Sequence, residues 1–198
     1  ELPDEYTIQY GGQYKEMRSA FESLGFALIL SVILVYLVMA AQFESLLHPL
    51  TIMLTVPLAL SGALFSLLLT GYSLSVLSII GMIMLAGIVV NNAIVLVDYI
   101  NTLRAEGKDK IEAILMAGPT RLRPILMTSL TTILGLLPLA LGLGQGAEIQ
   151  APMAIVVIGG LAFSTFLTLI ILPSIYLVID SLNDIMKDRF KYFQQDNG

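Results

Sequence analysis

The sequence contains no cysteine and only one histidine, His48, in 198 residues. Without cysteine the chain can form neither a disulfide framework nor a thiolate metal site. His48 lies beside Pro49 in an expected loop, where a structural or surface role fits best, and no cluster of metal-ligating residues surrounds it in the sequence. We therefore expect neither a metal centre nor a cofactor.

The motifs that accompany common enzyme chemistry are also lacking. The sequence has no Ser/His/Asp set, no His-Glu-x-x-His and no phosphate-binding glycine loop. Its two glycine-rich places lie in a loop and in an apolar run, which are the wrong contexts for phosphate binding. We expect that the chain is not an enzyme.

Charged residues are scarce, at 13% of the chain, whereas an ordinary soluble domain has about 25%. Hydrophobic residues make up 57%, and the mean hydropathy is +0.86. Such a chain has too little polar surface to cover a water-soluble globule. The net charge of −5 is spread over ends and loops, and no basic–aromatic patch indicates a nucleic-acid partner. The composition predicts a membrane protein.

Long apolar runs dominate what is present. A helix needs about 20 apolar residues to cross a bilayer, and five runs suit this length. We predict an all-α membrane protein, with a bundle of five transmembrane helices in residues 13–180. The expected spans are 24–42, 51–70, 75–100, 124–144 and 152–179.

The first residues have a different pattern. Residues 6–10 alternate apolar and polar side chains and are followed by Gly11 and Gly12, which predicts a short strand. Because a lone strand is not stable, residues 1–12 are expected to be the end of an upstream domain. The chain also begins with Glu1 rather than methionine, so we expect a segment of a larger protein.

Residues 101–121 are polar and separate the third span from the fourth. Within them Ile111, Ile114 and Leu115 recur at helical spacing. This pattern predicts a short amphipathic helix on the membrane surface, which ends at Gly118-Pro119.

Basic residues predict the orientation, because lysine and arginine concentrate on the cytoplasmic side of membrane proteins. Eight fall on one side of the five spans, and only Lys15 and Arg18 fall on the other. We therefore expect a multi-pass cell-membrane protein, the inner membrane if there are two, with lipid partners. Its tail, residues 181–198, is expected to be cytoplasmic. The eight are Arg104, Lys108, Lys110, Arg121, Arg123, Lys187, Arg189 and Lys191.

The most informative stretch is 87–98, GIVVNNAIVLVD, within the third span. Polar groups are costly inside a bilayer and usually face the interior of a bundle. Helical spacing places Asn91 and Asp98 on one face, roughly 10 Å apart along the axis. Asparagine does not titrate, so Asn91 and Asn92 can only position a neighbouring ionisable group. Simple hydrogen bonding between helices is the alternative.

Asp98 and the threonines of the fourth span each have two interpretations. Asp98 is either an interfacial acid or a relay contact to Arg121 or Arg123, and those arginines are otherwise positive-inside anchors. The fourth span carries either a hydroxyl face turned toward the asparagines or a surface for close helix packing. That face comprises Thr128, Thr131, Thr132 and Gly135. Close packing is also predicted for Gly62 with Ser66, and for Gly160, Ser164 and Thr168.

These residues resemble a known family. The stretch 87–98, together with RLRPILMTS at 121–129 and AQFES at 41–45, is similar to the resistance–nodulation–division (RND) efflux transporters. The resemblance implies the last five of twelve membrane helices, placed after the final strand of an extracytoplasmic porter domain. It also implies that an acidic, proton-carrying pair lies in the half of the transporter that this chain does not contain. A homotrimer and a periplasmic adaptor are further implied partners.

By the same resemblance, Thr128 and Arg121 match the relay threonine and arginine, and Asn92 keeps the family's asparagine. Asn91 departs from the pattern, because drug/proton antiporters of the family carry a lysine there. Losing this positive charge raises the apparent pKa of the acidic pair, so that it keeps a proton to higher pH.

We predict a proton-driven efflux transporter fragment that exports amphipathic small molecules and couples proton passage to the porter domains. The alternatives are an RND-superfamily factor for lipid or protein export, or a non-transporting scaffold similar to a sterol-sensing bundle.

Overall fold

The computed structural model describes residues 12–43 and 47–195. They form six helices, and five stretches are long and apolar enough to cross a membrane, as the sequence predicted. The predicted strand at 6–10 lies outside the described residues. The helices are α1 (Gln13–Phe43), α2 (Leu47–Met53), α3 (Thr55–Thr70), α4 (Val76–Ala105), α5 (Lys110–Ala140) and α6 (Ala147–Gln195).

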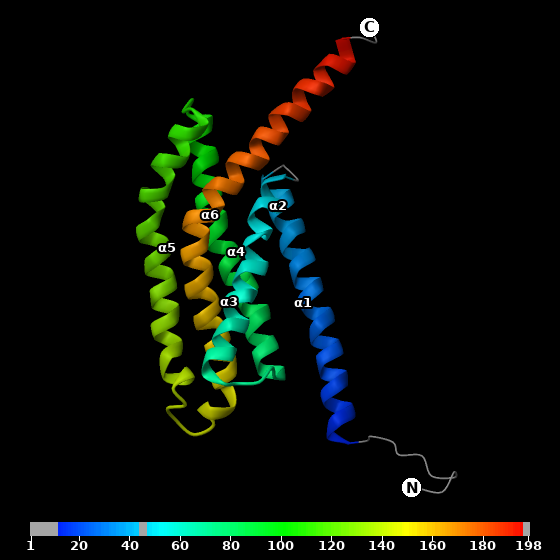
Figure 1. The fold of residues 1–198 in the computed structure, drawn as a ribbon, viewed down its shortest axis with the longest axis vertical. Helices are drawn as coiled ribbons and strands as arrows, with labels where there is room; N and C mark the ends of the chain where they lie inside the picture. Colours follow the sequence, from blue (N-terminus) through cyan, green and yellow to red (C-terminus); the bar gives the residue numbers. More distant parts are fainter. Residues whose placement is uncertain (1–11, 44–46, 196–198) are drawn as a thin grey trace, which may run out of the picture.

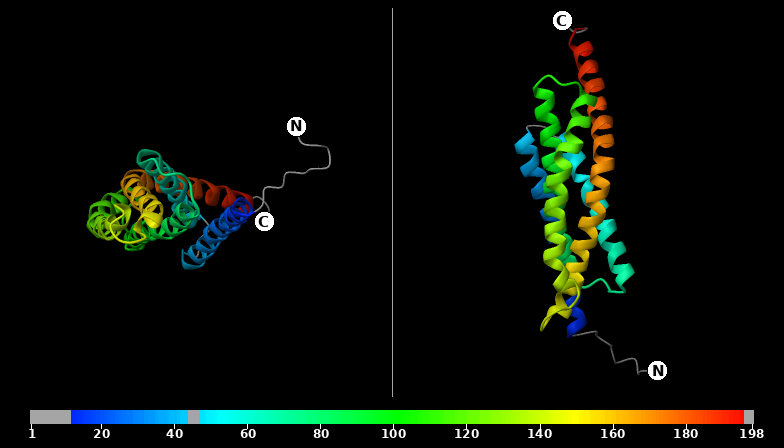
Figure 2. Two further views of the ribbon diagram at one scale, coloured as in Figure 1. Left: turned by 90° about the horizontal axis from the view of Figure 1, so that it is seen from below. Right: turned by 90° about the vertical axis from the view of Figure 1, so that its left-hand side faces the viewer.

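Helices α4 and α6 form the centre of the bundle (Figure 1). Helix α6 packs against α2, α3, α4 and α5, whereas α1 packs only against α2 and α4, within the described residues. One end of the bundle holds α2 and the α4–α5 turn, and the other holds the α3–α4 turn and the α5–α6 loop. The last part of α6 extends beyond the bundle (Figure 2). The polar node described below lies among α4, α5 and α6.

Helix α1 lies at the edge and exposes large apolar side chains, among them Phe26 (69% exposed) and Val38 (70%). In water such a surface would be a liability, whereas lipid tails are as apolar as these side chains. The exposed face therefore fits a lipid or protein neighbour within a membrane.

Helices α2 and α3 are two parts of one span, separated at Leu54. Pro57 has no N–H with which to bond the carbonyl of Met53, so the helix breaks just before it. The Thr55 hydroxyl donates to Ile52 O at 2.6 Å, a local hydrogen bond beside the break. The expected span 51–70 is thus briefly interrupted just before Pro57.

The predicted surface helix at 101–121 is wrong. Helix α4 continues to Ala105, a turn with Gly107 at φ 92° follows, and α5 then runs unbroken from Lys110 through Gly118-Pro119. The expected apolar spacing is present, but it begins a long helix. Ala113 and Ala117 are fully buried in one cluster with α4 residues, so this part of α5 lies against α4.

The α4–α5 turn carries an exposed ion pair, with Lys108 Nζ 2.7 Å from Glu112 Oε1. This hydrogen bond and the negative charge of Glu112 raise the pKa of Lys108. The pair links the α4–α5 turn to the first turn of α5.

The predicted glycine-rich loop is present between α5 and α6. Gly142, Gly144 and Gly146 have φ of 68°, 124° and 78°, a region that other residues rarely adopt. Glu148 and Gln150, which lie between the expected spans 124–144 and 152–179, belong to the first turns of α6. The loop is thus shorter than predicted.

Helices α3 and α6 approach closely through small residues, as predicted for Gly62 and Ser66. A Cβ atom at Gly159 would overlap Ser66, and one at Gly160 would overlap Leu85 and lie 3.0 Å from Ala59 O. The Ser66 hydroxyl also donates to Ile155 O at 3.1 Å across the contact. Glycine is therefore required where α6 crosses α3.

A buried tyrosine joins three helices at the α4–α5 end. The Tyr176 hydroxyl donates to Asn101 Oδ1 at 2.7 Å and accepts from Arg104 at 3.3 Å. The ring of His48 stacks on Tyr176, with centroids 5.7 Å apart and planes 12° apart. His48 thus makes a structural contact, and Tyr176 fastens α6 to α4 and α2.

Replacing Gly160 with alanine is expected to destabilise the protein by about 1–3 kcal/mol, because the new methyl group must displace Leu85 and the α3 backbone. Thermal unfolding of the purified full-length protein in detergent measures this. Gly135→Ala is the control, since a Cβ there has no neighbour within 4 Å. Equal unfolding temperatures for the two variants would refute the close-packing account.

The variant Tyr176→Phe keeps the stacked ring but loses both hydrogen bonds of the hydroxyl. We expect a loss of about 1–2 kcal/mol in the same unfolding measurement, because Asn101 then lacks its buried donor. Tyr99→Phe is the control, since the Tyr99 hydroxyl makes no hydrogen bond with the described residues. A Tyr176→Phe variant as stable as this control would show that the hydroxyl is dispensable.

Candidate functional site

The two asparagines of α4 point in different directions. Asn92 is 8% exposed and faces α5 and α6, whereas Asn91 is exposed. Successive residues on a helix are about 100° apart, so the two amides leave α4 in different directions. The pair that stands out in the sequence is therefore two sites.

Asn92 belongs to a buried polar node that joins three helices. Its Nδ2 donates to Ser129 Oγ of α5 at 3.3 Å, and Ser129 Oγ lies 2.9 Å from Thr165 Oγ1 of α6. Ser129 is 3% exposed and Thr165 is 6% exposed. In a membrane interior, each of these groups would be costly without a partner. The node therefore ties α4, α5 and α6 together.

Thr128 lies at the outer edge of this node. Its hydroxyl donates to Ile125 O at 3.0 Å and is 3.5 Å from Asn92 Oδ1, at the limit of a hydrogen bond. The residue is otherwise exposed. Thr128 thus places a hydroxyl between Asn92 and the open face of the bundle.

The rest of the predicted hydroxyl face does not reach the asparagines. Thr131 and Thr132 donate to the backbone carbonyls of Met127 and Thr128, at 2.7 Å and 2.9 Å. Gly135 has open space around it. Only Thr128 of this face contributes to the node. The buried face of α5 includes the next residue, Ser129, instead of Thr131 or Thr132.

The spacing of the buried residues of α5 could have identified Ser129 from the sequence. The buried residues of α5 are separated by four or eight positions, namely Ala113, Ala117, Ile125 and Ser129. Reading this spacing in the sequence would have placed Ser129, rather than Thr131 or Thr132, against α4. Thr165 was not singled out either, although it follows directly after Ser164, which was expected to pack.

Asn91 lies in an open groove between α1 and α4 with a volume of about 270 Å³. It is the one polar side chain among apolar neighbours there. The groove is lined by Leu34, Val35, Val38, Met39, Gly87, Val90, Asn91 and Ile94. An amide in such surroundings lacks partners of its own and suits a polar group on a further helix.

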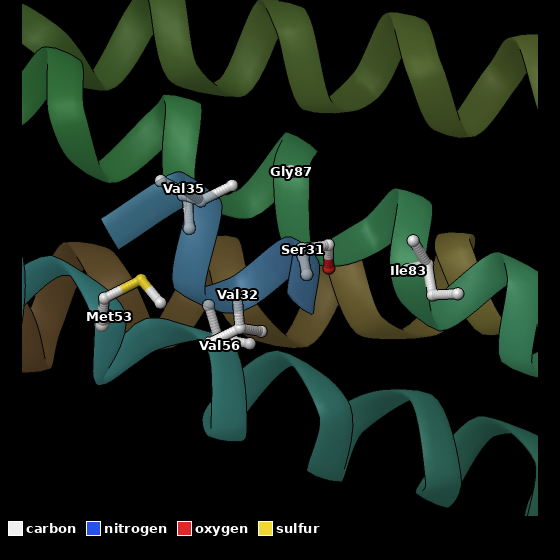
Figure 3. Close-up of a pocket in the computed structure, with 9 residues that line it drawn as sticks. Ser31, Val32, Val35, Met53, Val56, Ile83 and Gly87 are labelled. Atoms are coloured by element: carbon white, nitrogen blue, oxygen red, sulfur yellow. The ribbon is translucent and has the colours of Figure 1, made fainter. Parts of the chain in front are cut away.

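A smaller pocket adjoins this groove between α1, α3 and α4 (Figure 3), and its volume is about 90 Å³. Val32, Val35 and Val56 border it, and Ser31 is the polar exception. The Ser31 hydroxyl donates to Leu28 O at 2.8 Å within its own helix. The pocket is thus apolar and too small for a drug-sized ligand, which occupies about 300–1,000 Å³.

Arg121 does not pair with Asp98. Its Cζ lies 4.5 Å from the centroid of the Tyr99 ring, a cation–π contact. Its Nε is buried and has no hydrogen-bond partner among the described residues. Asp98 and Arg123 are exposed, and no ion pair within 12–43 and 47–177 joins the acid to either arginine. Of the two interpretations of Asp98, the exposed position among the described residues fits the interfacial acid.

The arrangement can hold and orient polar groups, but it contains no titratable side chain at the node. The described residues also include no group of three or more His, Cys, Asp or Glu side chains that could hold a metal ion. An amide and hydroxyls can donate to, or accept from, a carboxyl group on a facing helix. The node thus offers one amide and several hydroxyls for hydrogen bonding.

The chain is similar to known proteins in both sequence and structure. The sequence model of the AcrB/AcrD/AcrF family matches residues 1–180. Two crystal structures of a heavy metal efflux pump, in crystal forms II and I, are similar, with TM-scores of 0.82 and 0.80 and 36% sequence identity. Each similarity covers 91% of this chain but 18% of the pump's chain. This chain belongs to the AcrB/AcrD/AcrF family of resistance–nodulation–division transporters.

Proposed function

We propose that this chain is the C-terminal membrane part of a proton-driven efflux transporter. Its role is to couple proton passage to movement of extracytoplasmic porter domains. The observation that carries this proposal is the buried node of Asn92 and Ser129, with Thr128 at its edge, in a chain of this family. Polar groups are retained inside a membrane bundle where they serve an ion or proton path.

The proton carrier in this proposal is an acidic pair on a helix of the same protein that this chain does not contain. That helix would face the groove of Asn91 and the exposed side of Thr128. Arg121, held over Tyr99 with an unpartnered Nε, supplies positive charge on the same side of α5. Asp98 lies two turns beyond Asn91 on the same exposed face, at the cytoplasmic mouth of the path.

The transported substrate is proposed to be an amphipathic small molecule that binds outside this bundle. The pocket between α1, α3 and α4 is too small to hold one. A metal ion is the second candidate substrate, because the similar crystal structures are of a heavy metal efflux pump. A trimeric assembly in the cell membrane, with the C-terminus in the cytoplasm and an adaptor partner, completes the proposal.

Removing the node is expected to abolish coupled transport. In proteoliposomes of the full-length protein with an imposed proton gradient, Asn92→Ala and Thr128→Ala should lower efflux at least about tenfold, equivalent to 1.4 kcal/mol. Thr131→Ala is the matched control, because its hydroxyl only bonds its own helix. Separate assays with an amphipathic dye and a divalent metal ion distinguish the two substrate classes. Unimpaired efflux in both node variants would contradict the proposed function.

Restoring a positive charge at position 91 is expected to change the pH dependence. A lysine there stabilises the charged form of a facing acid, so the midpoint of the pH profile of efflux should move to lower pH by about one unit or more in Asn91→Lys. Asn91→Met, which is similar in length but uncharged, serves as the control. A lysine variant with an unchanged midpoint would show that no acid faces Asn91.

A further inference from the structure

Arg121 lies on the buried face of α5, the face that packs against α4. It comes four residues after Ala117, which is 0% exposed, and four before Ile125, which is 2% exposed. Arg121 itself is partly buried, whereas Arg123 is exposed. A charged side chain therefore occupies a position whose neighbours along the same face are apolar, and such a position requires a partner for the charge.

Across the contact between α4 and α5, the partner of Arg121 is the ring of Tyr99. The guanidinium carbon Cζ lies 4.5 Å from the ring centroid. The negative face of an aromatic ring attracts a cation within about 6 Å, more strongly where water is excluded. Among the described residues Arg121 makes no hydrogen bond or ion pair, and its Nε is buried without an acceptor. In this part of the chain the ring is thus the one partner that holds the guanidinium.

The place of this charge depends on the ring, because an arginine side chain has an alternative. A long basic side chain near a membrane surface turns its charged end toward headgroup water. Arg121 lies eleven residues after Lys110, the first residue of α5, which corresponds to roughly 16 Å along the helix. Without the ring contact, the guanidinium is free to turn toward the α4–α5 turn. The ring therefore keeps the positive charge deeper in the bundle.

The same pair of helix faces also carries the polar node. Tyr99 follows Asn92 by seven residues on α4, and Arg121 precedes Thr128 by seven residues on α5. Seven residues make two helical turns, so both contacts lie on one side of each helix, roughly 10 Å apart. A fixed charge at this distance acts more strongly across an apolar interior than through water. The Tyr99–Arg121 contact thus places a positive charge at a set distance from Thr128 and Asn92.

We propose that Tyr99 is a positioning residue whose ring holds the Arg121 guanidinium between α4 and α5, at a fixed depth beside the proton path. This inference rests on the proposed function, which uses the charge of Arg121. Arginine stays protonated at every physiological pH, so the ring determines where the charge lies and not whether it is present. The Tyr99 hydroxyl makes no hydrogen bond with the described residues, so the aromatic face alone carries this role.

The test weakens the ring face while keeping the ring in its place. Tyr99→Phe and its mono-, di- and trifluorinated phenylalanine counterparts are prepared in the full-length protein, because each added fluorine withdraws electron density from the ring face. In proteoliposomes with an imposed proton gradient, the maximal efflux rate should fall stepwise, by about two- to fivefold from phenylalanine to its trifluorinated form. The substrate concentration for half-maximal efflux should not change, because substrate binds outside this bundle in the proposed function. Tyr99→Phe should keep the wild-type rate, since the ring face survives.

The same series at Tyr72 is the matched control, because Tyr72 is exposed and contacts no cation among the described residues. If the fluorinated proteins are obtained in too small amounts, a comparison of Tyr99→Leu with Tyr99→Phe serves the same purpose. Leucine is apolar but offers no ring face to the guanidinium, so Tyr99→Leu should transport more slowly than Tyr99→Phe by a similar factor.

Equal maximal rates along the series at position 99 would overturn the inference. A decline of the same size at Tyr72 would do so too, because it would show that fluorination acts without the cation. If Asn92→Ala and Thr128→Ala transport normally, the proposed function itself fails. If those two lose transport while the rates along the series at position 99 stay equal, only the positioning role of Tyr99 is refuted.

Discussion

A buried amide in an apolar bundle is the constraint on which the centre of this structure depends. Asn92 lies where water cannot satisfy it, so α5 and α6 must supply hydroxyls at Ser129 and Thr165. These bonds fix how α5 is rotated against α4. The small residues of α3 and α6 allow the close approach that completes the core.

One part of the molecule is closely packed, whereas another part exposes apolar surface and a groove. Helices α3, α4 and α6 pack through glycine and alanine, and Tyr176 of α6 contacts α4 and α2 at one end. In contrast, α1 lies at the edge with most of its apolar surface exposed, and beside it Asn91 faces a groove. The polar node lies among α4, α5 and α6, where Ser129 and Thr165 are buried and Thr128 is exposed. Such a site can respond to a group on a neighbouring helix without disturbing the core.

The sequence predicted the membrane class, the five spans and the family, because long apolar runs and short motifs carry those signals locally. The predictions from the sequence were less accurate where the outcome depends on the length of a helix or on which of its faces is buried. The surface helix at 101–121 proved to be the start of α5, since buried Ala113 and Ala117 hold it against α4. In one of the two interpretations Thr131 and Thr132 faced the asparagines, but a shift of one residue in helix phase brings in Ser129 instead. Which helix or groove Asn91 and Asn92 each face depends on how helices that are distant in the sequence pack around α4.

The central claim is that the Asn92 node couples proton movement to transport. Substrate-dependent proton flux, followed with a pH-sensitive dye in proteoliposomes of the full-length protein, tests it most directly. We expect substrate to evoke proton flux in the wild type, and expect Asn92→Ala to lose both proton flux and substrate movement together. Substrate movement without proton flux in the wild type, or coupled flux that persists in Asn92→Ala, would contradict the account.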